Sequence, residues 1–539
     1  MTELKIKKLF IANRGEIARR VKRACDALSI PTVLAVSDPD IESLAARESE
    51  ELAYLGGSTA RDSYLDIDKI IKATKESGCN AIHPGYGFLS ENSDFVERVE
   101  KEGLIFVGPS SASIKALGNK PNARKAAKNA GVPITEGSDG ITGDAELLAA
   151  AKRVGFPIIL KAAAGGGGRG MRIVRQESEF AESLERARAE GLKNFGSAEV
   201  YFEQFIEEPR HVEVQLFGDS HGSVIHFGTR DCSAQRRHQK LVEEAPAPFL
   251  SPETRERIHE AAVKAAKSVG YTNAGTAEFL VKGDKFYFLE INTRIQVEHP
   301  VTEIITGIDL VQLQLKVAMG EPLPLTQQEV TFTGHAIELR INAEDPSEGF
   351  RPALGKIGRW QRVCESYVRE DFGYESGDTV HPYYDSLISK VIVYGSSRAE
   401  VLAKTFHTLR SYVVEGLPTS LAFHKWIVCN EQFQRDGIDI GYVERHFTSQ
   451  SILDVAPLYY LDPKAKQPSP TETHGVVERV TVPFENGFTI LDVVHEPGGT
   501  FLGMPLDSNG SPRAQHFWRR SNTFHAVLTS VVEGLTAQK

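Results

Sequence analysis

Two glutamates on either side of a turn sequence have the spacing of a metal site. Glu278 and Glu290 are twelve residues apart, in the strand-like segments GTAEFLV and KFYFLEIN, and the turn sequence Lys282-Gly283-Asp284 lies between them. This pattern predicts an antiparallel hairpin in which the two carboxylates face each other. Because like charges opposite each other destabilise a sheet, we expect a cation between them, and Asn292 would add an oxygen ligand suited to Mg²⁺. The alternative is an edge hairpin on which both glutamates point into solvent.

The segment that follows this hairpin, RIQVEHP, carries groups suited to binding and deprotonating a small anion. Arg294 can hold a planar anion through two parallel hydrogen bonds. Gln296 and a backbone N–H group could complete the pocket, and Glu298 is a carboxylate able to act as a base. The segment therefore predicts an acid–base site beside the metal site.

A glycine-rich segment, KAAAGGGGRGM, is a third candidate. Glycines lack a Cβ atom, so their backbone N–H groups can approach and bind phosphate oxygens. Lys161 ends the preceding strand-like run and could reach a phosphate as a point charge, with Arg169 nearby. The segment matches neither common glycine motif for nucleotides, and it joins two strand-like runs. It predicts either a lid over a nucleotide or a flexible linker, and its glycines are Gly165, Gly166, Gly167, Gly168 and Gly170.

The first hundred residues alternate between strand-like and helix-like patterns. KKLFIAN, PTVLAVS, NAIHPG and LIFVGPS contain buried strands, and Ile17, Val21, Ala24 and Leu28 recur at helical spacing between the first two. Strands separated by helices of this length predict right-handed crossovers and a parallel sheet. Residues 1–118 are therefore expected to form an open α/β domain with ligand-binding loops at the strand ends.

The remaining chain divides into three further units. Residues 119–207 contain the glycine-rich segment, and residues 208–447 form a larger mixed α/β region with the glutamate hairpin. Residues 448–539 contain the linker-like sequence PKAKQPSPTETHG and the strand-like runs VVERVTVPF and FTILDVV. We expect a small β-rich appendage there.

Composition excludes several classes of protein. The 539 residues carry a net charge of −10 with the basic residues dispersed, which argues against general nucleic-acid binding. No apolar run is long enough to cross a membrane, and the N-terminal apolar stretch is too short for a signal peptide. The five cysteines show no paired spacing, which favours a reducing compartment, and we expect a soluble, cytoplasmic protein. They are Cys25, Cys79, Cys232, Cys364 and Cys429.

Taken in order along the chain, these motifs resemble those of biotin carboxylase, a family of the ATP-grasp superfamily. The matching stretches are IANRGEIA, HPGYGFLSEN, KAAAGGGGRGM, EEPRHVEVQ, RDCSAQRRHQKLVEEAPAP, EINTRIQVEHPVTE, GHAIELRINAEDP and HPYYDS. The resemblance runs through residue 447 and implies an ATP-grasp fold. It consists of an N-terminal parallel-sheet domain, a glycine-loop lid and a C-terminal mixed α/β domain. The β-rich appendage has no match.

The resemblance implies that MgATP is bound, with Mg²⁺ or Mn²⁺ as the metal. Glu278, Glu290 and Asn292 would bind that metal. Glu203 and the backbone near Phe205 would hold adenine. The residues that match nucleotide-binding positions are Lys120, Lys161, Gly165, Gly166, Gly167, Gly168, Arg169, Gly170, Met171, Glu203, Phe205, Ile206, His211, Gln235, His238, Glu278 and Glu290.

The resemblance also implies the chemistry. Bicarbonate is activated as carboxyphosphate, and its carboxyl group then passes to a ureido nitrogen of biotin. Glu298 would deprotonate bicarbonate, Arg294 would orient it, and Arg340 would stabilise charge on the ureido oxygen of biotin. Arg340 could instead pair structurally with Glu338 or Asp345. The bicarbonate pocket would comprise Lys240, Arg294, Gln296, Val297 and Glu298.

The partners follow from what the sequence lacks. A biotin acceptor lysine is flanked by methionine in such carriers, and none of the four methionines adjoins a lysine. We therefore expect a biotin carboxyl carrier protein and a carboxyltransferase on separate chains, and the family implies a homodimer. The parent enzyme would be an acetyl-CoA carboxylase or a related biotin-dependent carboxylase. Two alternatives stay open: another ATP-grasp carboxylate–amine ligase, and a non-catalytic scaffold subunit.

Overall fold

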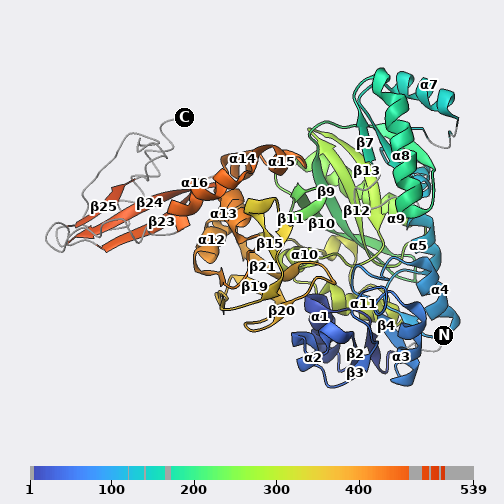
Figure 1. The fold of residues 1–539 in the computed structure, drawn as a ribbon, viewed down its shortest axis with the longest axis horizontal. Helices are drawn as coiled ribbons and strands as arrows, with labels where there is room; N and C mark the ends of the chain where they lie inside the picture. Colours follow the sequence, from blue (N-terminus) through green and yellow to red (C-terminus); the bar gives the residue numbers. More distant parts are fainter. Residues whose placement is uncertain are drawn as a thin grey trace.

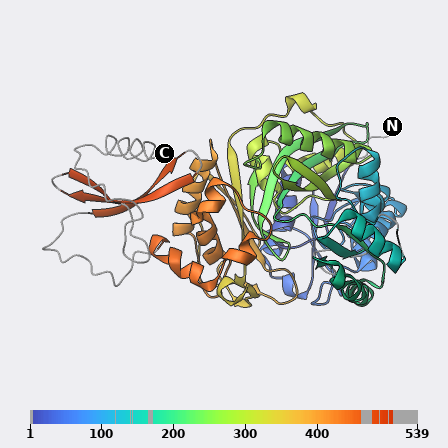
Figure 2. The same ribbon diagram turned by 90° about the horizontal axis from the view of Figure 1, so that it is seen from above.

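The computed structural model describes residues 5–118, 120–138, 141, 143–163, 171–459, 476–484, 487–496 and 499–503. Its body contains a five-stranded, a three-stranded and an eight-stranded sheet, with three short two-stranded sheets at the C-terminal side. In Figures 1 and 2 the last three strands extend away from this body at the end opposite the N-terminal domain. No helix in these ranges combines the length and apolarity needed to span a membrane.

The N-terminal domain contains the parallel sheet predicted from the alternating pattern. Its strand order is β3-β2-β1-β4-β5, and every neighbouring pair is parallel. Leu9 and Ile11 pack toward α1, whereas Phe10 packs on the other face, so both faces are apolar. The elements are β1 (Leu9–Ile11), α1 (Gly15–Ala27), β2 (Thr32–Val36), α2 (Leu44–Arg47), β3 (Leu52–Tyr54), α3 (Ile67–Glu76), β4 (Ala81–His83), α4 (Ser93–Lys101), β5 (Ile105–Phe106) and α5 (Ser111–Gly118).

The lid is built on a small antiparallel sheet. β6 (Ile158–Ala162) lies between β7 (Met171–Val174) and β8 (Val200–Gln204), and the helices are α6 (Lys120–Asn129), α7 (Asp144–Val154) and α8 (Phe180–Phe195). Lys161 pairs with Met171, so the glycine-rich segment connects β6 to β7 as the two strand-like runs predicted. Residues 164–170 themselves, with Gly165, Gly166, Gly167, Gly168, Arg169 and Gly170, lie outside the described residues, as does the side chain of Lys120.

One eight-stranded antiparallel sheet runs through the rest of the body. Its order is β13-β12-β9-β10-β11-β14-β21-β19. One face packs on α9 and α12 through apolar residues, and the other packs partly on α10 and α11. Its strands are β9 (Arg210–Gly218), β10 (Val224–Arg236), β11 (Gln239–Ala245), β12 (Asn273–Lys282), β13 (Lys285–Asn292), β14 (His335–Asn342), β19 (Val368–Phe372) and β21 (Leu387–Gly395). The helices are α9 (Pro252–Lys267), α10 (His299–Thr306), α11 (Leu310–Ala318) and α12 (Arg398–Ser411).

The C-terminal segment differs from expectation in one respect. The sequence suggested only a linker and strands after residue 447, but the structure places a helix, α16 (Ser449–Tyr459), there. It packs on α13 (Leu421–Cys429), so a tertiary contact stabilises a short helix of modest amphipathicity. The two predicted appendage strands are β23 (Val476–Phe484) and β24 (Gly487–Glu496), and a third strand that was not predicted, β25 (Gly499–Gly503), completes an antiparallel sheet. The linker sequence between them and α16 lies outside the described residues.

The remaining short elements complete the C-terminal side. They are β15 (Glu344–Asp345), β16 (Arg351–Pro352), β17 (Gly355–Lys356), β18 (Trp360–Gln361), β20 (Thr379–Val380), β22 (Val413–Val414), α14 (Glu431–Arg435) and α15 (Tyr442–His446).

Candidate active site

The predicted glutamate hairpin forms, with the predicted register. Glu278 on β12 pairs directly with Glu290 on β13, and Gly283 makes the turn with φ +58°. The solvent-exposed alternative is wrong for Glu278, whose side chain is buried. The row continues across the sheet, because Glu278 also pairs with Glu213 on β9 and Glu213 with Arg230 on β10. Four ionisable side chains thus share one face of the sheet.

Lys240 lies at the centre of this face. Its Nζ atom donates to Glu213 at 2.7 Å, to Glu278 at 2.9 Å and to Glu298 at 2.7 Å. Burial lowers the pKa of Lys240, but the three carboxylates outweigh burial and raise it well above its ordinary range. The ammonium therefore supplies the positive charge that the facing carboxylates require.

Glu298 is held between two cations. One carboxylate oxygen accepts from Lys240, and the other accepts from Nη2 of Arg340 at 2.8 Å. Although burial alone would raise the pKa of Glu298, Lys240, Arg340 and Arg230 hold it well below its usual range. Glu298 is thus ionised at neutral pH, which is the form that accepts a proton.

Arg340 uses a second carboxylate that the sequence did not indicate. Its Nε atom donates to Glu243 on β11 at 2.6 Å. Within the described part of the chain, the partners considered from the sequence, Glu338 and Asp345, make no hydrogen bond to its side chain. Arg340 is therefore bridged between Glu243 and Glu298.

Arg294 is tied to the N-terminal domain. Its Nε atom donates to Glu91 at 2.9 Å, and the same carboxylate accepts from the backbone N–H of Thr293 at 3.0 Å. Glu91 belongs to the segment HPGYGFLSEN, which follows β4 at the carboxyl edge of the parallel sheet. Sequence analysis singled out this segment but not Glu91, because the contact joins positions 203 residues apart.

The amide side chains near the hairpin complete the same site. Nδ2 of Asn292 and Nε2 of Gln296 both donate to Glu278, at 2.8 and 3.2 Å. The carbonyl oxygen of Val297 accepts from Nζ of Lys390 at 2.8 Å, which fixes the backbone before Glu298. The structure thus brings together the predicted residues Lys240, Glu278, Glu290, Asn292, Arg294, Gln296, Val297, Glu298 and Arg340.

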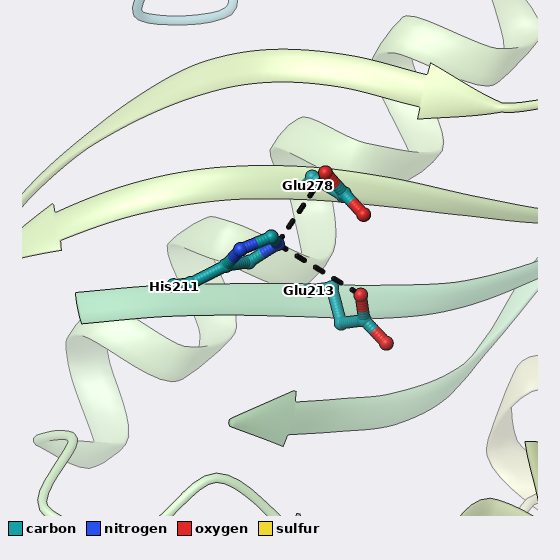
Figure 3. A group of neighbouring side chains, drawn as sticks. All are labelled: His211, Glu213 and Glu278. Carbon is teal, nitrogen blue, oxygen red and sulfur yellow. Dashed lines mark ion pairs between the residues drawn. The ribbon is translucent and has the colours of Figure 1, made fainter. Parts of the chain in front are cut away.

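A histidine faces the carboxylate row from β9. Figure 3 shows His211 pointing between Glu278 and Glu213, with Nε2 at 3.4 and 3.9 Å from their oxygens. Its Nδ1 atom lies 3.3 Å from Nε2 of Gln235. Burial lowers the pKa of His211, but Glu278 and Glu213 raise it above its ordinary value. Oxygen atoms of Glu278 and Glu213 lie within 4.8 Å of this imidazole, a donor set that fits a divalent cation.

Glu203, one of the predicted nucleotide-binding residues, has a carboxylate that is paired inside the protein. The carboxylate of Glu203 accepts from Lys161 and from Thr135, each at 2.7 Å, and lies 2.9 Å from Arg124. Burial would raise the pKa of Glu203, but Lys161 and Arg124 lower it to about 2. The side chain of Glu203 is thus engaged within the protein. Phe205 donates its N–H to Pro157 at 3.0 Å, Ile206 follows it, and His238 lies in the turn between β10 and β11 with φ +64°.

Sequence reasoning missed the buried partners of the predicted residues. Glu213, Arg230, Glu243 and Lys390 are these buried partners, and a further partner that was missed, Glu91, is exposed. Arg230 is fully buried and donates to Glu213, Gln215 and Thr302. The available signal was the occurrence of charged residues at alternate positions of otherwise apolar strands, as in HVEVQ. That pattern also fits a strand with one solvent-exposed face.

Three family models match the chain. They are the biotin carboxylase N-terminal domain over residues 5–114, the carbamoyl-phosphate synthase L chain ATP-binding domain over 119–326, and the biotin carboxylase C-terminal domain over 338–445. The biotin carboxylase of Pseudomonas aeruginosa is 47% identical over 442 residues, which is 82% of this chain and 98% of that protein. Biotin carboxylase 1 of Bacillus subtilis is 47% identical over 444 residues, 82% of this chain and 99% of that protein.

Solved structures agree with these relationships. The structure of a biotin carboxylase–β-γ-ATP complex from Campylobacter jejuni superposes on this chain with a TM-score of 0.80 at 43% sequence identity. The superposition covers 83% of this chain and 100% of the Campylobacter chain. The biotin carboxylase domain dimer of Hydrogenobacter thermophilus 2-oxoglutarate carboxylase, with MgADP, ADP and bicarbonate, also gives 0.80, at 44% identity over 84% of this chain and 99% of its own. With the predicted ATP-grasp architecture and its carboxylate–lysine–arginine site in place, the chain belongs to the biotin carboxylase family of ATP-dependent ligases.

Proposed function

We propose that the observed site performs the first half-reaction of a biotin-dependent carboxylase, with Glu298 as the base and Arg340 as the biotin-facing cation. In that reaction MgATP activates bicarbonate as carboxyphosphate, and the carboxyl group passes to the ureido nitrogen of biotin. The observation that carries this proposal is the position of Glu298 between Lys240 and Arg340. One carboxylate thereby touches both the cation assigned to bicarbonate and the cation assigned to biotin.

Bicarbonate binds beside Lys240 and Arg294 in this scheme. Arg294 offers a planar fork and Lys240 a point charge, and Gln296 and the backbone at Val297 complete the pocket. Glu298 removes the bicarbonate proton, so the dianion attacks the γ-phosphorus of ATP while ADP leaves. Fixing the anion beside its base removes much of the entropic barrier to this step.

The nucleotide and the metal lie on the hairpin side of Lys240. Glu278 and Glu290, with Asn292, would hold Mg²⁺ or Mn²⁺, which when bound neutralises phosphate charge. The support is the facing register of the two glutamates and the orientation of His211 toward Glu278. Lys161, Met171, Gln235 and His238 remain predicted nucleotide contacts, together with Lys120, Glu203, Phe205, Ile206 and the glycine-rich segment.

Biotin meets Arg340 when the bond between the carboxyl carbon and the phosphate oxygen of carboxyphosphate breaks and the carboxyl group bonds to the ureido nitrogen. Inorganic phosphate leaves and takes up the ureido N–H proton. Negative charge develops on the ureido oxygen, and a guanidinium already oriented by two carboxylates can stabilise it without reorganisation. A carrier protein would present the biotin, and a carboxyltransferase on a further chain would use the product.

Association is also part of the proposal. The chain forms a homodimer, as the biotin carboxylase domain of the Hydrogenobacter protein does. The appendage formed by β23, β24 and β25 is assigned to assembly with a partner, because it extends from the body at the end away from β9, β12 and β13 (Figure 1). Deleting residues 465–539 should then abolish partner association, and unchanged association would contradict this role. The cytoplasmic location stays a prediction.

The first test is ATP cleavage by the purified chain with Mg²⁺, with and without bicarbonate and free biotin. We expect a bicarbonate-dependent rate that rises with biotin and collapses in Glu298→Gln and in Arg340→Ala. Glu415→Gln and Arg359→Ala are matched controls, because that pair is largely exposed and remote from the site. Bicarbonate-independent cleavage, or no response to biotin in a folded ATP-binding protein, would point to another carboxylate ligase.

A further inference from the structure

Two glutamates behind Arg340 face each other inside the protein without enough positive charge for both. Glu243 on β11 pairs directly with Glu338 on β14, and directly paired residues project to the same face of a sheet. Both side chains are fully buried. Two ionised carboxylates in this arrangement would repel each other in a medium of low dielectric constant.

Of the four carboxylate oxygens of Glu243 and Glu338, only one accepts a hydrogen bond from the described residues. Oε1 of Glu243 accepts from Arg340, whereas Oε2 of Glu243 and both oxygens of Glu338 have no hydrogen-bond partner among the described residues. A buried ionised carboxylate without partners costs several kcal/mol, so such a group takes up a proton instead.

Lys390, a second cation close to Glu338, makes its polar contacts with other groups. Lys390 on β21 pairs with Arg340 across the strands and lies on the same face as Glu338. Its ammonium, however, bonds the carbonyl of Val297 at 2.8 Å and lies 3.1 Å from Glu16. Lys390 therefore does not neutralise Glu338 through a direct ion pair.

We propose that Glu243 and Glu338 together carry a single proton, which lies on Glu338 and leaves the negative charge on Glu243, and that this pair positions Arg340 for biotin. Glu243 and Glu338 are positioning residues and do not touch substrate. The proposal rests on the role assigned to Arg340 above. When Glu298 takes the bicarbonate proton, its attraction for Nη2 of Arg340 weakens, and Glu243 still holds Nε. The guanidinium can then turn toward the ureido oxygen while remaining in the site.

The electrostatics agree with this geometry. Burial raises the pKa of Glu338 well above its usual value, and the nearby Glu243 adds to the effect. Burial also raises the pKa of Glu243, to about 7, although Arg340 lowers it. The other charged groups that act on the pair are Lys240 on β11, Arg340 on β14, Lys390 on β21 and Glu298 just before α10. Glu16 on α1 and His299 on α10 lie near Lys390. His299 stays neutral, because burial and then Lys390 lower its pKa.

Infrared spectroscopy tests the proton directly. The wild-type-minus-Glu338→Gln difference spectrum at about pH 8 should contain the carbonyl stretch of a protonated carboxylic acid, since a raised pKa keeps Glu338 protonated there. The matched control is Glu244→Gln. Glu244 is the next residue on β11 after Glu243 and is also buried. Burial alone would raise its pKa, but Arg398 and His335 lower that pKa to about 2. Its difference spectrum should contain only ionised carboxylate bands. An ionised-carboxylate band for Glu338 would overturn the proposal.

Kinetics tests the positioning role. Loss of a charged hydrogen bond to Arg340 in Glu243→Gln should raise the KM for free biotin about 10- to 100-fold and lower kcat less. In the wild type, the KM for biotin should fall as pH rises through about 7, because Glu243 becomes charged and anchors Arg340. This dependence should vanish in Glu243→Gln and be partly restored in Glu243→Asp.

The two proposals fail in different ways. If Arg340→Ala keeps the full response to biotin, the role assigned to Arg340 is wrong, whatever the infrared result. If Arg340→Ala loses that response but Glu243→Gln keeps the wild-type KM and its pH dependence, the carboxyl pair does not position Arg340, and the present inference is overturned alone.

Discussion

The parallel sheet of the N-terminal domain and the charged face of the eight-stranded sheet are both buried, but by different side chains. In the parallel sheet, Leu9, Phe10 and Ile11 on β1 are all 0% exposed. On the eight-stranded sheet, Glu213 and Arg230 are also 0% exposed. Helices cover the first sheet on both faces, whereas the second carries its charged row on the face opposite α9 and α12.

The difference shows how the protein separates stability from catalysis. An apolar layer is stabilised by the area removed from water, so it tolerates changes that keep volume. A layer of buried ions is stable only if each charged side chain pairs with one of opposite charge, because burying an unpaired ion is very unfavourable in free energy. The second layer is therefore the less tolerant one, and it presents fixed cations to an anionic substrate.

The largest effect is expected from removing the central cation of the charged face. Lys240→Met should lower kcat for bicarbonate-dependent ATP cleavage by about 100- to 1,000-fold, the usual loss when one preorganised donor is removed. Steady-state ATP cleavage with saturating nucleotide measures it. Lys264→Met on α9 is the control, because Lys264 is largely exposed and pairs with Glu260 at the surface. A loss of less than about tenfold in Lys240→Met would mean that the charged face is structural.

The next effect concerns stability. Arg230→Met should lower the free energy of unfolding by about 3–5 kcal/mol, because it leaves Glu213 without its buried guanidinium partner. Denaturant titration of the variant against the exposed control Arg186→Met measures the difference. If the variant were as stable as the wild type, hydrophobic replacement would be tolerated here as it is in the parallel sheet.

The contribution of Glu244, which lies on β11 next to Glu243, to the stability of the fold should depend on pH. Arg398 and His335 overcome burial and lower the pKa of Glu244 to about 2, so its ionised form stabilises the fold above the ordinary carboxyl pKa. This contribution, on the order of 3 kcal/mol, should disappear as pH falls from about 4.5 toward 2. Glu244→Gln should accordingly be less stable than wild type at about pH 6 and approach it in acid. A difference independent of pH would contradict the ion-pair account.

The smallest effect is expected in the apolar layer. Ile82 on β4 is 0% exposed, and Ile82→Leu conserves its volume. The variant should lose less than about 1.5 kcal/mol of stability and keep its bicarbonate-dependent activity. Thermal unfolding together with the ATP cleavage assay checks both parts. A loss as large as that of Arg230→Met would remove the contrast between the two layers.

Local sequence patterns predicted those parts of the fold that depend on the spacing of apolar residues or on a single turn. The strands before and after Ile17 and Val21, the parallel sheet and the pairing of Glu278 with Glu290 all follow from residue spacing and a glycine turn. The helix α16 was missed, because its packing on α13 rather than its own sequence stabilises it. The ion pairs of the Glu203 carboxylate were also not foreseen, because Lys161 and Arg124 reach it from elements earlier in the chain.

The sequence by itself determined the family, the hairpin and the identity of the principal charged residues, since these depend on short motifs and on side-chain chemistry. Only the tertiary structure decided which charges neutralise one another. Arg340 and Glu243 are 97 positions apart, and Arg294 and Glu91 are 203 apart. No spacing rule reaches so far, because such contacts arise when strands and domains are brought together by burial of apolar surface elsewhere. The partners of Arg340, and the proton that we assign to Glu338, are therefore properties of the folded sheet.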